Sequence, residues 1–395
     1  MARHLGPDAY GLLTYAVALV ALIASPAGLG LETLAVRDLV AEPERAAIIW
    51  GNSAALRLMA GALVIAIGLP LAAITASADM SFTVACAAIG AGLQASEALE
   101  WRFTAGNRFS GFVLPRMAAG AVSALLRVAM VAAGATVRWF ASMLAIESGI
   151  RAIALAIWSR RAGHSLLPQR VMRAEFIALL RRGLPLGLAA SAITVYMRID
   201  QVMLGVLLGK RDVGLYGAVA TLSEAWYLIP LALGRAAAPQ IAAMAKGKRQ
   251  EYEFEIVRLF RVTGAIHVAV ALAVTFGSSL ILRLVYGVDF VPAAAALVVH
   301  IWTGIFVSLG VISSLWLINE GLQRFMLMRT VTGCVCNIAL NLVLIPRLGI
   351  MGAAVATLIA QCTSAWLMDL SHARTRRMFW LKLQALLPMI FKEAS

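Results

Sequence analysis

The chain has 395 residues, of which 61% are hydrophobic and 14% are charged, and its mean hydropathy is +0.85. Soluble globular domains are about half apolar, so this composition excludes that class and indicates a polytopic membrane protein. The net charge of +14 raises the alternative of a nucleic-acid partner. The placement of the charge argues against it, because 23 lysine and arginine residues fall in one alternate set of loops and six in the other. This positive-inside pattern predicts that the first set is cytoplasmic and that the first residues lie outside.

Eleven apolar windows are long enough to cross a membrane. A helix needs about 20 mostly apolar residues to span the hydrocarbon core. Backbone amides in lipid must be satisfied within the segment, so these windows are predicted to be helices. They cover residues 10–31, 52–75, 79–98, 109–135, 137–158, 184–208, 213–238, 257–285, 291–319, 325–345 and 349–369. The predicted fold class is an all-α polytopic membrane protein with about 11 full transmembrane helices.

The two halves of the sequence also resemble each other. "LGPDAYGLLTYA" at 5–16 aligns with "LGKRDVGLYGAV" at 208–219, at an offset of 203 residues that also carries the first five windows onto the second half. This predicts two helical-bundle lobes related by a parallel internal repeat, as in many transporters. The second lobe has a helix, 184–208, before this signature, whereas the first lobe starts at the signature. We therefore expect that a first helix and the C-terminal helices are missing.

The repeat and the loops predict four parts. They are an N-terminal transmembrane lobe at 1–158, a cytoplasmic linker at 159–183, a C-terminal transmembrane lobe at 184–371, and a basic cytoplasmic segment with the start of a truncated helix at 372–395. In the linker Met172, Phe176, Leu179 and Leu180 share one helical face, which predicts an interfacial amphipathic helix that ties the lobes together. A basic tether near anionic headgroups is the alternative.

The stretch "YMRIDQVMLG" at 196–205 places Arg198 and Asp200 inside an apolar window. They lie about 200° apart around a helix and cannot simply neutralise each other. A charge near the middle of a bilayer costs at least about 2.5–3.5 kcal/mol, and the usual reason to keep one is a polar cavity or an ion pathway. Glu224 in the next window is the predicted partner of Arg198. Arg127 in "SALLRVAMV" is predicted to be the one deep cation of the N-terminal lobe, facing Asp200 or a phosphate. Structural ion pairs that hold the lobes in register are the alternative.

Other polar residues inside the windows have a structural and a functional interpretation. His267 and His300 either hydrogen-bond a neighbouring helix or act as proton relays. Asn337, Asn341 and Gln361 either join helices or line a cavity. The four cysteines lack metal-ligand spacing and are predicted to be packing residues, so no metal site is expected.

Two long segments resemble a known family. "ARHLGPDAYGLLTYAVALVALIASPAGLGLETLAVRDLV" is similar to the segment that ends the first helix and makes the second in Wzx-type polysaccharide flippases. "LPLGLAASAITVYMRIDQVMLGVLLGKRDVGLYGAVATLSEAWYLIPLALGRAAAPQIAAM" resembles the start of their second lobe. The resemblance covers nearly the whole chain. It implies the fold of the multidrug/oligosaccharidyl-lipid/polysaccharide (MATE-like) exporter superfamily, with two six-helix lobes around a central cavity. The chain departs from this pattern by lacking the first helix and everything beyond the start of a thirteenth.

The resemblance also implies a function. Such a flippase moves a polyprenyl-diphosphate-linked oligosaccharide, a polysaccharide repeat unit, from the inner to the outer leaflet of the bacterial inner membrane by alternating access. Arg127 and Arg198 would bind the diphosphate or an acidic sugar, and Asp200 or Glu224 would handle a coupling proton or sodium ion. The expected partners are the lipid-linked oligosaccharide, membrane lipids and a polysaccharide polymerase, and not nucleic acid.

The alternatives are a lipid II or multidrug exporter of the same superfamily, and a membrane-embedded glycosyltransferase or ligase. Such enzymes need a carboxylate metal motif or a sizeable catalytic loop. The sequence has no Asp-x-Asp motif, and external loops such as "TASADMS" are short. We therefore expect that the protein is not an enzyme.

Overall fold

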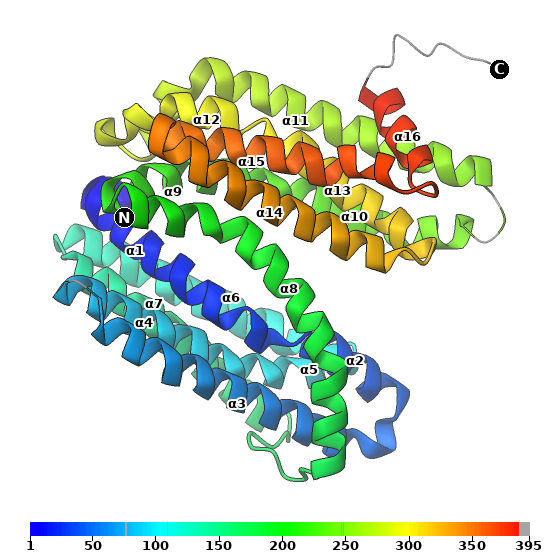
Figure 1. The fold of residues 1–395 in the computed structure, drawn as a ribbon. Helices are drawn as coiled ribbons and strands as arrows, with labels where there is room; N and C mark the ends of the chain where they lie inside the picture. The colour runs from blue at the N-terminus through cyan, green and yellow to red at the C-terminus, as the bar shows by residue number, and fades with distance from the viewer. Residues whose placement is uncertain (76, 109, 246, 248, 387–395) are drawn as a thin grey trace. The chain divides into compact units, whose positions relative to one another are not determined.

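The computed structural model describes residues 1–386 except residues 76, 109, 246 and 248. These residues form helices and turns, without a strand among them, and divide into two compact units, Met1–Val202 and Met203–Ser395 (Figure 1). The predicted all-α polytopic fold is confirmed. Lys246 and Lys248, two of the predicted cytoplasmic cations, lie outside the described residues, as does most of the predicted truncated helix, 387–395.

The N-terminal unit is a bundle whose long helices run in roughly one direction in Figure 1. Its elements are α1 (Ala2–Ala24), η1 (Pro26–Gly28), α2 (Leu31–Ala41), η2 (Pro43–Arg45), α3 (Ala46–Ala73), α4 (Ala78–Leu93), η3 (Gln94–Leu99), α5 (Glu100–Ala105), α6 (Ser110–Ala132), α7 (Val137–Arg161) and α8 (Arg173–Leu207), whose last residues extend past Val202.

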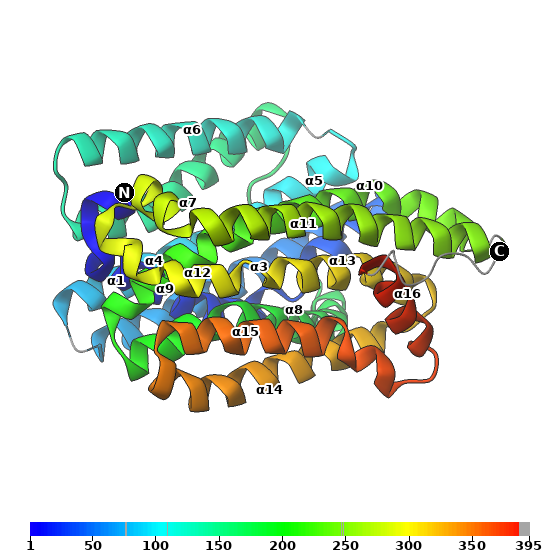
Figure 2. The same cartoon turned by 90° about the horizontal axis from the view of Figure 1, so that it is seen from above.

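The C-terminal unit is a second bundle, in which α11, α13, α14 and α15 run side by side (Figure 2). Its elements are α9 (Lys210–Glu224), η4 (Ala225–Tyr227), α10 (Leu228–Met244), α11 (Arg249–Val285), η5 (Val288–Ala293), α12 (Ala294–His300), α13 (Thr303–Asn319), α14 (Gln323–Leu348), α15 (Ile350–Ala365), η6 (Leu367–Ser371) and α16 (Arg376–Leu386).

Within the described residues all eleven predicted windows fall on helical segments, but several of these segments are interrupted. In the described part of the chain, nine helices are long and apolar enough to cross a membrane, and Val288–His300 with Thr303–Asn319 makes a tenth span bent by 45°. The window 213–238 is divided into α9, η4 and α10, of 15, 3 and 17 residues. Glu224 ends α9 at this break, and Arg235 lies in α10. Both charges lower the hydropathy of the segment, so it does not count among the candidate spans.

The predicted internal repeat is visible in the order of the elements. In each unit a first helix gives way to a 3-10 turn and a second helix, as α1–η1–α2 and as α9–η4–α10. A long helix follows, α3 or α11, and then a broken one, α4–η3–α5 or α12–α13. Gly6 and Gly209, which the alignment pairs, have φ values of 73° and 107° with extended ψ. This backbone conformation favours glycine, which explains why both copies of the signature keep it.

The linker between α7 and α8 is held against the start of α3. A Cβ at Gly51 would lie 2.4 Å from the carbonyl oxygen of Arg170, so only glycine lets the two backbones approach this closely. The next residue, Asn52, accepts a hydrogen bond on Oδ1 from the Met172 amide at 3.1 Å. Arg102 adds a third attachment, because it donates to the Ser165 carbonyl at 3.1 Å. Residues 165–172 are therefore docked on the N-terminal unit.

The predicted amphipathic face also packs on this unit. Residues 173–183 form the first turns of α8, and Leu179 is buried in a cluster with Leu31 and Trp50. Phe176 and Leu180 pack against the same cluster. Phe176, Leu179 and Leu180 are therefore covered by protein instead of lying at the lipid surface, whereas Met172 precedes α8 and is 49% exposed. The predicted boundaries at 158, 183 and 371 remain predictions.

The docked linker generates a first prediction. Gly51→Ala would force a Cβ into the Arg170 carbonyl, and overpacking of this kind costs about 1–3 kcal/mol. We expect a lower Tm in detergent and faster tryptic cleavage after Arg170 and Arg173. Gly120→Ala on α6 is the matched control, because nothing lies within 4 Å of its Cβ position. Equal behaviour of the two variants would show that the linker is not held in this way.

Candidate functional site

Five charged side chains form a continuous series of ion pairs in the N-terminal unit, which we call the charged ladder. Arg57 on α3 and Arg151 on α7 both bind Glu97 of η3, with N–O distances of 3.4 and 3.3 Å. Arg151 also lies 4.0 Å from Glu147, one turn away on α7. Glu147 in turn pairs with Arg127 of α6. The ladder thus joins four elements and contains three arginines and two glutamates.

Close helix packing brings the first pair of the ladder together. Gly61 of α3 and Gly92 of α4 face each other, and a Cβ at Gly61 would lie 2.6 Å from the Gly92 carbonyl oxygen. Small residues permit such close contact between helices in membranes. Arg57 lies one turn before Gly61, and Glu97 follows Gly92. The contact therefore places both side chains within ion-pair distance.

A break in helical geometry positions Glu97. After Leu93 the chain changes from α-helix to the 3-10 turn η3. The Trp50 indole donates to the Ala98 carbonyl at 2.9 Å and so satisfies one of the carbonyl groups of this stretch. Breaks of this kind within a span often mark functional positions.

The ladder lies at hydrocarbon depth. At 1.5 Å per residue, Arg57 is about 16 Å from the start of α3 and Arg151 about 15 Å from the end of α7, both predicted cytoplasmic ends. Arg127 lies nearer the other end of its helix, about 26 Å from the start of α6 and about 8 Å from its last residue, Ala132. The side chains of Arg57 and Arg151 are only 14% and 26% exposed. Charges at such depth usually face a polar cavity and mark a substrate or ion pathway.

A cavity of about 390 Å³ adjoins the ladder. This volume falls in the range of small-molecule sites, about 300–1,000 Å³. The cavity is lined by Val17, Val20, Ala21, Ala24, Ser25, Gly28, Arg57, Ala87, Gly90, Ala91, Gln94, Leu144, Ser148 and Thr194. Nine of its fourteen lining residues are apolar or glycine, and the polar ones are Ser25, Arg57, Gln94, Ser148 and Thr194. With one more cation than anion in the ladder, the arrangement is suited to an anionic group.

The ladder corrects one prediction. Arg127 is not the one deep cation of the N-terminal lobe, because Arg57 and Arg151 also lie within spans. Arg57 is one of the 23 basic residues that the charge pattern places in the cytoplasmic loops, and this prediction is wrong because Arg57 lies well inside α3. The signal that sequence reasoning missed is Glu147 and Arg151, an i, i+4 pair of opposite charges inside an apolar window.

The other predicted site residues are placed as follows. Asp200 is buried, while Arg198 and Glu224 are half-buried, and none of the three is without a partner. Arg198 and Asp200 belong to the first compact unit and Glu224 to the second. Their roles, like that of Arg127 in binding substrate, remain predictions.

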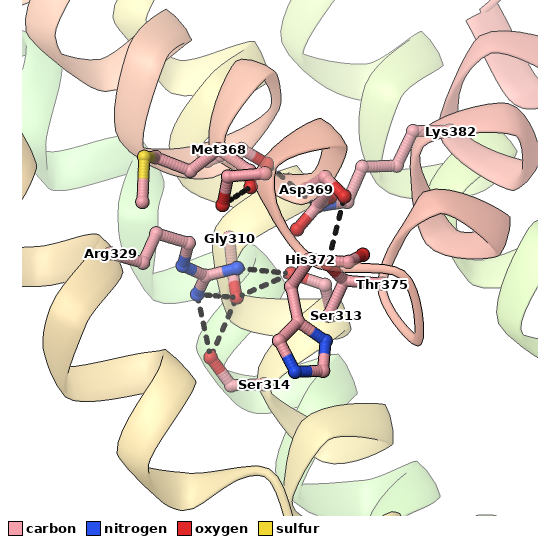
Figure 3. A network of polar contacts seen from close by, with 11 residues as sticks. Gly310, Ser313, Ser314, Arg329, Met368, Asp369, His372, Thr375 and Lys382 are labelled. Atoms are coloured by element: carbon pink, nitrogen blue, oxygen red, sulfur yellow. Dashed lines mark hydrogen bonds and ion pairs between the residues drawn. The ribbon is translucent and has the colours of Figure 1, made fainter.

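A second polar network lies in the C-terminal unit around α16 (Figure 3). Lys382 and Asp369 form a fully buried ion pair at 2.6 Å, and Lys382 also donates to the Ala365 carbonyl at 2.6 Å. Thr375 donates to the Asp369 carbonyl at 2.8 Å. These bonds fix α16 to the end of α15. The contacts are internal, so we assign this network a structural role.

Arg329 in the same network shows how the two units differ. It donates to the hydroxyl of Ser313 at 2.8 Å and to the Gly310 carbonyl at 3.1 Å (Figure 3). Arg329 and Arg116 are each the seventh residue of their helices, α14 and α6. Arg116 pairs with the carboxylate of Glu100 at 3.2 Å. The equivalent arginines therefore have a hydroxyl partner in one unit and a carboxylate partner in the other.

Asn337 of α14 joins two helices, which is the structural one of its two interpretations, and Asn341 bonds to Asn337 within α14. Asn337 donates to the Thr357 hydroxyl on α15 at 3.4 Å, and Asn341 donates to Asn337 at 3.1 Å. The Tyr216 hydroxyl of α9 lies 3.2 Å from the same threonine oxygen. This network is neutral, in contrast to the charged ladder. No group of three or more His, Cys, Asp and Glu side chains suited to a metal ion occurs among the described residues.

Family models match most of the chain. The model described as polysaccharide biosynthesis protein matches residues 1–245, and a second model, MatE, matches residues 185–343. A search of curated proteins finds no match.

Solved structures share the fold. A multidrug resistance MATE family transporter of the MOP superfamily, in an inward-facing conformation, has a TM-score of 0.74 and 16% identity, over 96% of this chain and 92% of that one. The lipid II flippase MurJ, inward closed, has a TM-score of 0.73 and 13% identity, over 99% and 92%. A MOP superfamily transporter from Pyrococcus furiosus has a TM-score of 0.63 and 15% identity, over 96% and 88%. At these low sequence identities the similarity establishes a shared fold and no more.

The shared carboxylate of the ladder generates a second prediction. Glu97→Gln removes the carboxylate that Arg57 and Arg151 share and leaves Arg151 only its longer contact with Glu147, so we expect a loss of about 1–3 kcal/mol in the free energy of unfolding. Adding Arg151→Gln should cost less than the sum of the two single changes, because they share one interaction. Thermal unfolding in detergent measures this, with Glu44→Gln on exposed η2 as the control. Additive losses would argue against a coupled ladder.

The buried lysine generates a third prediction. Burial lowers the pKa of Lys382 from 10.5 to about 8, although Asp369 partly opposes this shift. Between these pH values the unfolded chain holds a proton that the folded chain has released, so this group makes the free energy of unfolding rise with pH. The stability of the wild type relative to Lys382→Met should therefore increase from pH 8 to pH 10 in chemical unfolding. A constant difference across this range would show that the lysine is not titrating there.

Proposed function

The chain belongs to the polysaccharide biosynthesis protein family, and from this premise we propose that it translocates a polyprenyl-diphosphate-linked oligosaccharide. The substrate would move from the inner to the outer leaflet of the bacterial inner membrane. The observation that supports this most is the charged ladder beside the 390 Å³ cavity, at a depth where charges are costly. We propose transport without catalysis.

The physical problem is the diphosphate. It cannot cross about 30 Å of hydrocarbon unless cations accompany it in a polar cavity. Guanidinium groups suit this task because they bind phosphate oxygens through paired N–H donors and keep their charge. In the proposed cycle Arg57 and Arg151 exchange the Glu97 carboxylate for the diphosphate, and Arg127 and Arg198 contribute further contacts. The polyprenyl tail remains in the lipid.

Glutamates released by this exchange would be left in a poorly hydrated site. A proton or a sodium ion would neutralise their negative charge, and this is the physical role of the coupling ion in the proposed cycle. Asp200 or Glu224 are the residues that we propose to carry this ion, as the sequence predicts. Alternating access of the two lobes would then expose the cavity to each side in turn, and a polysaccharide polymerase would consume the product.

Other substrates of the superfamily differ in charge. A cationic drug would meet an excess of positive charge in the ladder, which disfavours the multidrug alternative. Lipid II also carries a diphosphate, so the charged ladder suits both substrates equally. Only recognition of the sugar can distinguish them. A substrate panel that contains both lipid-linked glycans separates these two functions.

Transport in vesicles gives the fourth prediction. We expect the full chain in proteoliposomes to translocate a fluorescent undecaprenyl-diphosphate oligosaccharide, and Arg57→Gln or Arg151→Gln to slow it by about tenfold or more. One lost charge-assisted bond of about 1.5–3 kcal/mol accounts for this factor. Arg57→Lys should retain more transport than Arg57→Gln.

The control is Arg249→Gln, which removes a half-exposed arginine of the other unit that pairs with Glu320 at 2.5 Å. It should leave transport unchanged. Thermal unfolding of each variant shows whether it is folded. If the Arg57→Gln and Arg151→Gln variants are folded and transport at the normal rate, the charged ladder does not bind the substrate. If the chain transports lipid II and not the other lipid-linked oligosaccharide, the proposed substrate is wrong and lipid II is the substrate.

A further inference from the structure

A second cavity of about 320 Å³ lies in the N-terminal unit, where α2 ends and where α3 and α8 begin. Its wall carries charges of both signs, Asp38, Glu42, Arg45, Glu175 and Arg182. None of these residues belongs to the charged ladder. The cavity is therefore separate from the site proposed for transport.

The charged residues of this cavity form ion pairs in both directions between α8 and the segment around η2, so that each side supplies an arginine and a carboxylate. Asp38 pairs with Arg182 at 3.0 Å, and Arg45 pairs with Glu175 and, at 2.6 Å, with Glu42. The two arginine side chains are each 46% exposed. A guanidinium has five N–H donors, and these pairs use only one or two of them. Such exposed pairs contribute little to stability, so a ligand with matching charges can share them or open them.

One side chain of the wall is buried and has an unmet hydrogen bond. Ser53 has no exposed surface, and its Oγ has no partner among the described residues. It nevertheless lines the cavity. A buried hydroxyl without a partner is costly, and it indicates a polar occupant in the space that it borders.

The cavity lies at the membrane boundary. The candidate spans Pro43–Ala73 and Arg173–Leu207 both begin at its wall. Apolar side chains next to the wall are exposed, among them Val40 at 59% and Ile177 at 38%. Acyl chains would cover these side chains, while the cavity opens at the level of lipid headgroups.

We propose that this cavity binds the headgroup of a phospholipid with a primary ammonium, a phosphoethanolamine. The phosphate lies between Arg45 and Arg182, and the ammonium lies against the carboxylates of Asp38, Glu42 and Glu175. A purely anionic headgroup meets three carboxylates, and a simple cation meets two arginines, so neither matches the wall. A quaternary ammonium has no N–H to donate to the carboxylates, which distinguishes choline from ethanolamine. This inference does not depend on the transported substrate.

Lipid retention tests the proposal. The full chain is purified, delipidated in detergent and incubated with dioleoyl phosphatidylethanolamine, phosphatidylcholine or phosphatidylglycerol, and retained lipid is counted by native mass spectrometry. We expect at least threefold more phosphatidylethanolamine than either other lipid. Glu175→Gln should bring the ratio to phosphatidylcholine close to one. The matched control is Glu320→Gln, which alters a half-exposed Arg–Glu pair of the C-terminal unit and should preserve the selectivity.

Three outcomes overturn the proposal. Equal retention of the three lipids shows that the cavity does not discriminate between their headgroups. Preference for phosphatidylglycerol shows an anion site. If glycerophosphoethanolamine binds the delipidated chain as tightly as phosphatidylethanolamine does, the acyl chains add nothing and a free small molecule is the occupant. Ser53→Ala gives a further check, because it keeps every charge, and we expect it to weaken retention less than Glu175→Gln does.

Discussion

Hydrocarbon cannot hydrate a charge, and the N-terminal unit is organised around this constraint. Arg57, Arg151 and Arg127 lie within candidate spans, and each has a glutamate partner from another helical element. The contact of Gly61 with Gly92 and the 3-10 break at η3 bring the first of these partners into place. In this unit these local departures from regular helix packing bring an arginine and its carboxylate partner together.

The C-terminal unit has the same element order and a different polar interior. Its deep network consists of neutral amides and hydroxyls around Asn337 and Thr357, and Arg329 uses serine partners where Arg116 uses a carboxylate. Its buried ion pair joins Lys382 of α16 to Asp369, which lies near the end of the last candidate span, Ile350–Ser371. The two bundles therefore share the order of their elements, while the polar contacts described for each are of different kinds. The charged ladder is the observation from which we propose the N-terminal unit as the site for an anionic headgroup.

Much of the fold could be predicted from the sequence because hydropathy and window length act locally. Each window became helical, and the glycine signature revealed the repeat through a backbone conformation that both copies keep. The ladder could not be predicted in the same way. Glu97 meets Arg57 only because α3 and α4 touch at two glycines, and the sequence does not show that contact. Arg57 also follows a basic loop closely, so the positive-inside pattern assigned it to that loop.

In the proposed cycle the carboxylates of the ladder would matter for release as much as for binding. A cavity with bare arginines would hold a diphosphate tightly and would be costly to move through the membrane when empty. Glu97 and Glu147 act as internal anions that neutralise the arginines in the empty state. Substrate binding then replaces one set of ion pairs by another, so the net free energy of binding is the small difference of two large terms. In the proposed cycle this exchange lets the carrier reorient both loaded and empty, which a flippase that turns over must do.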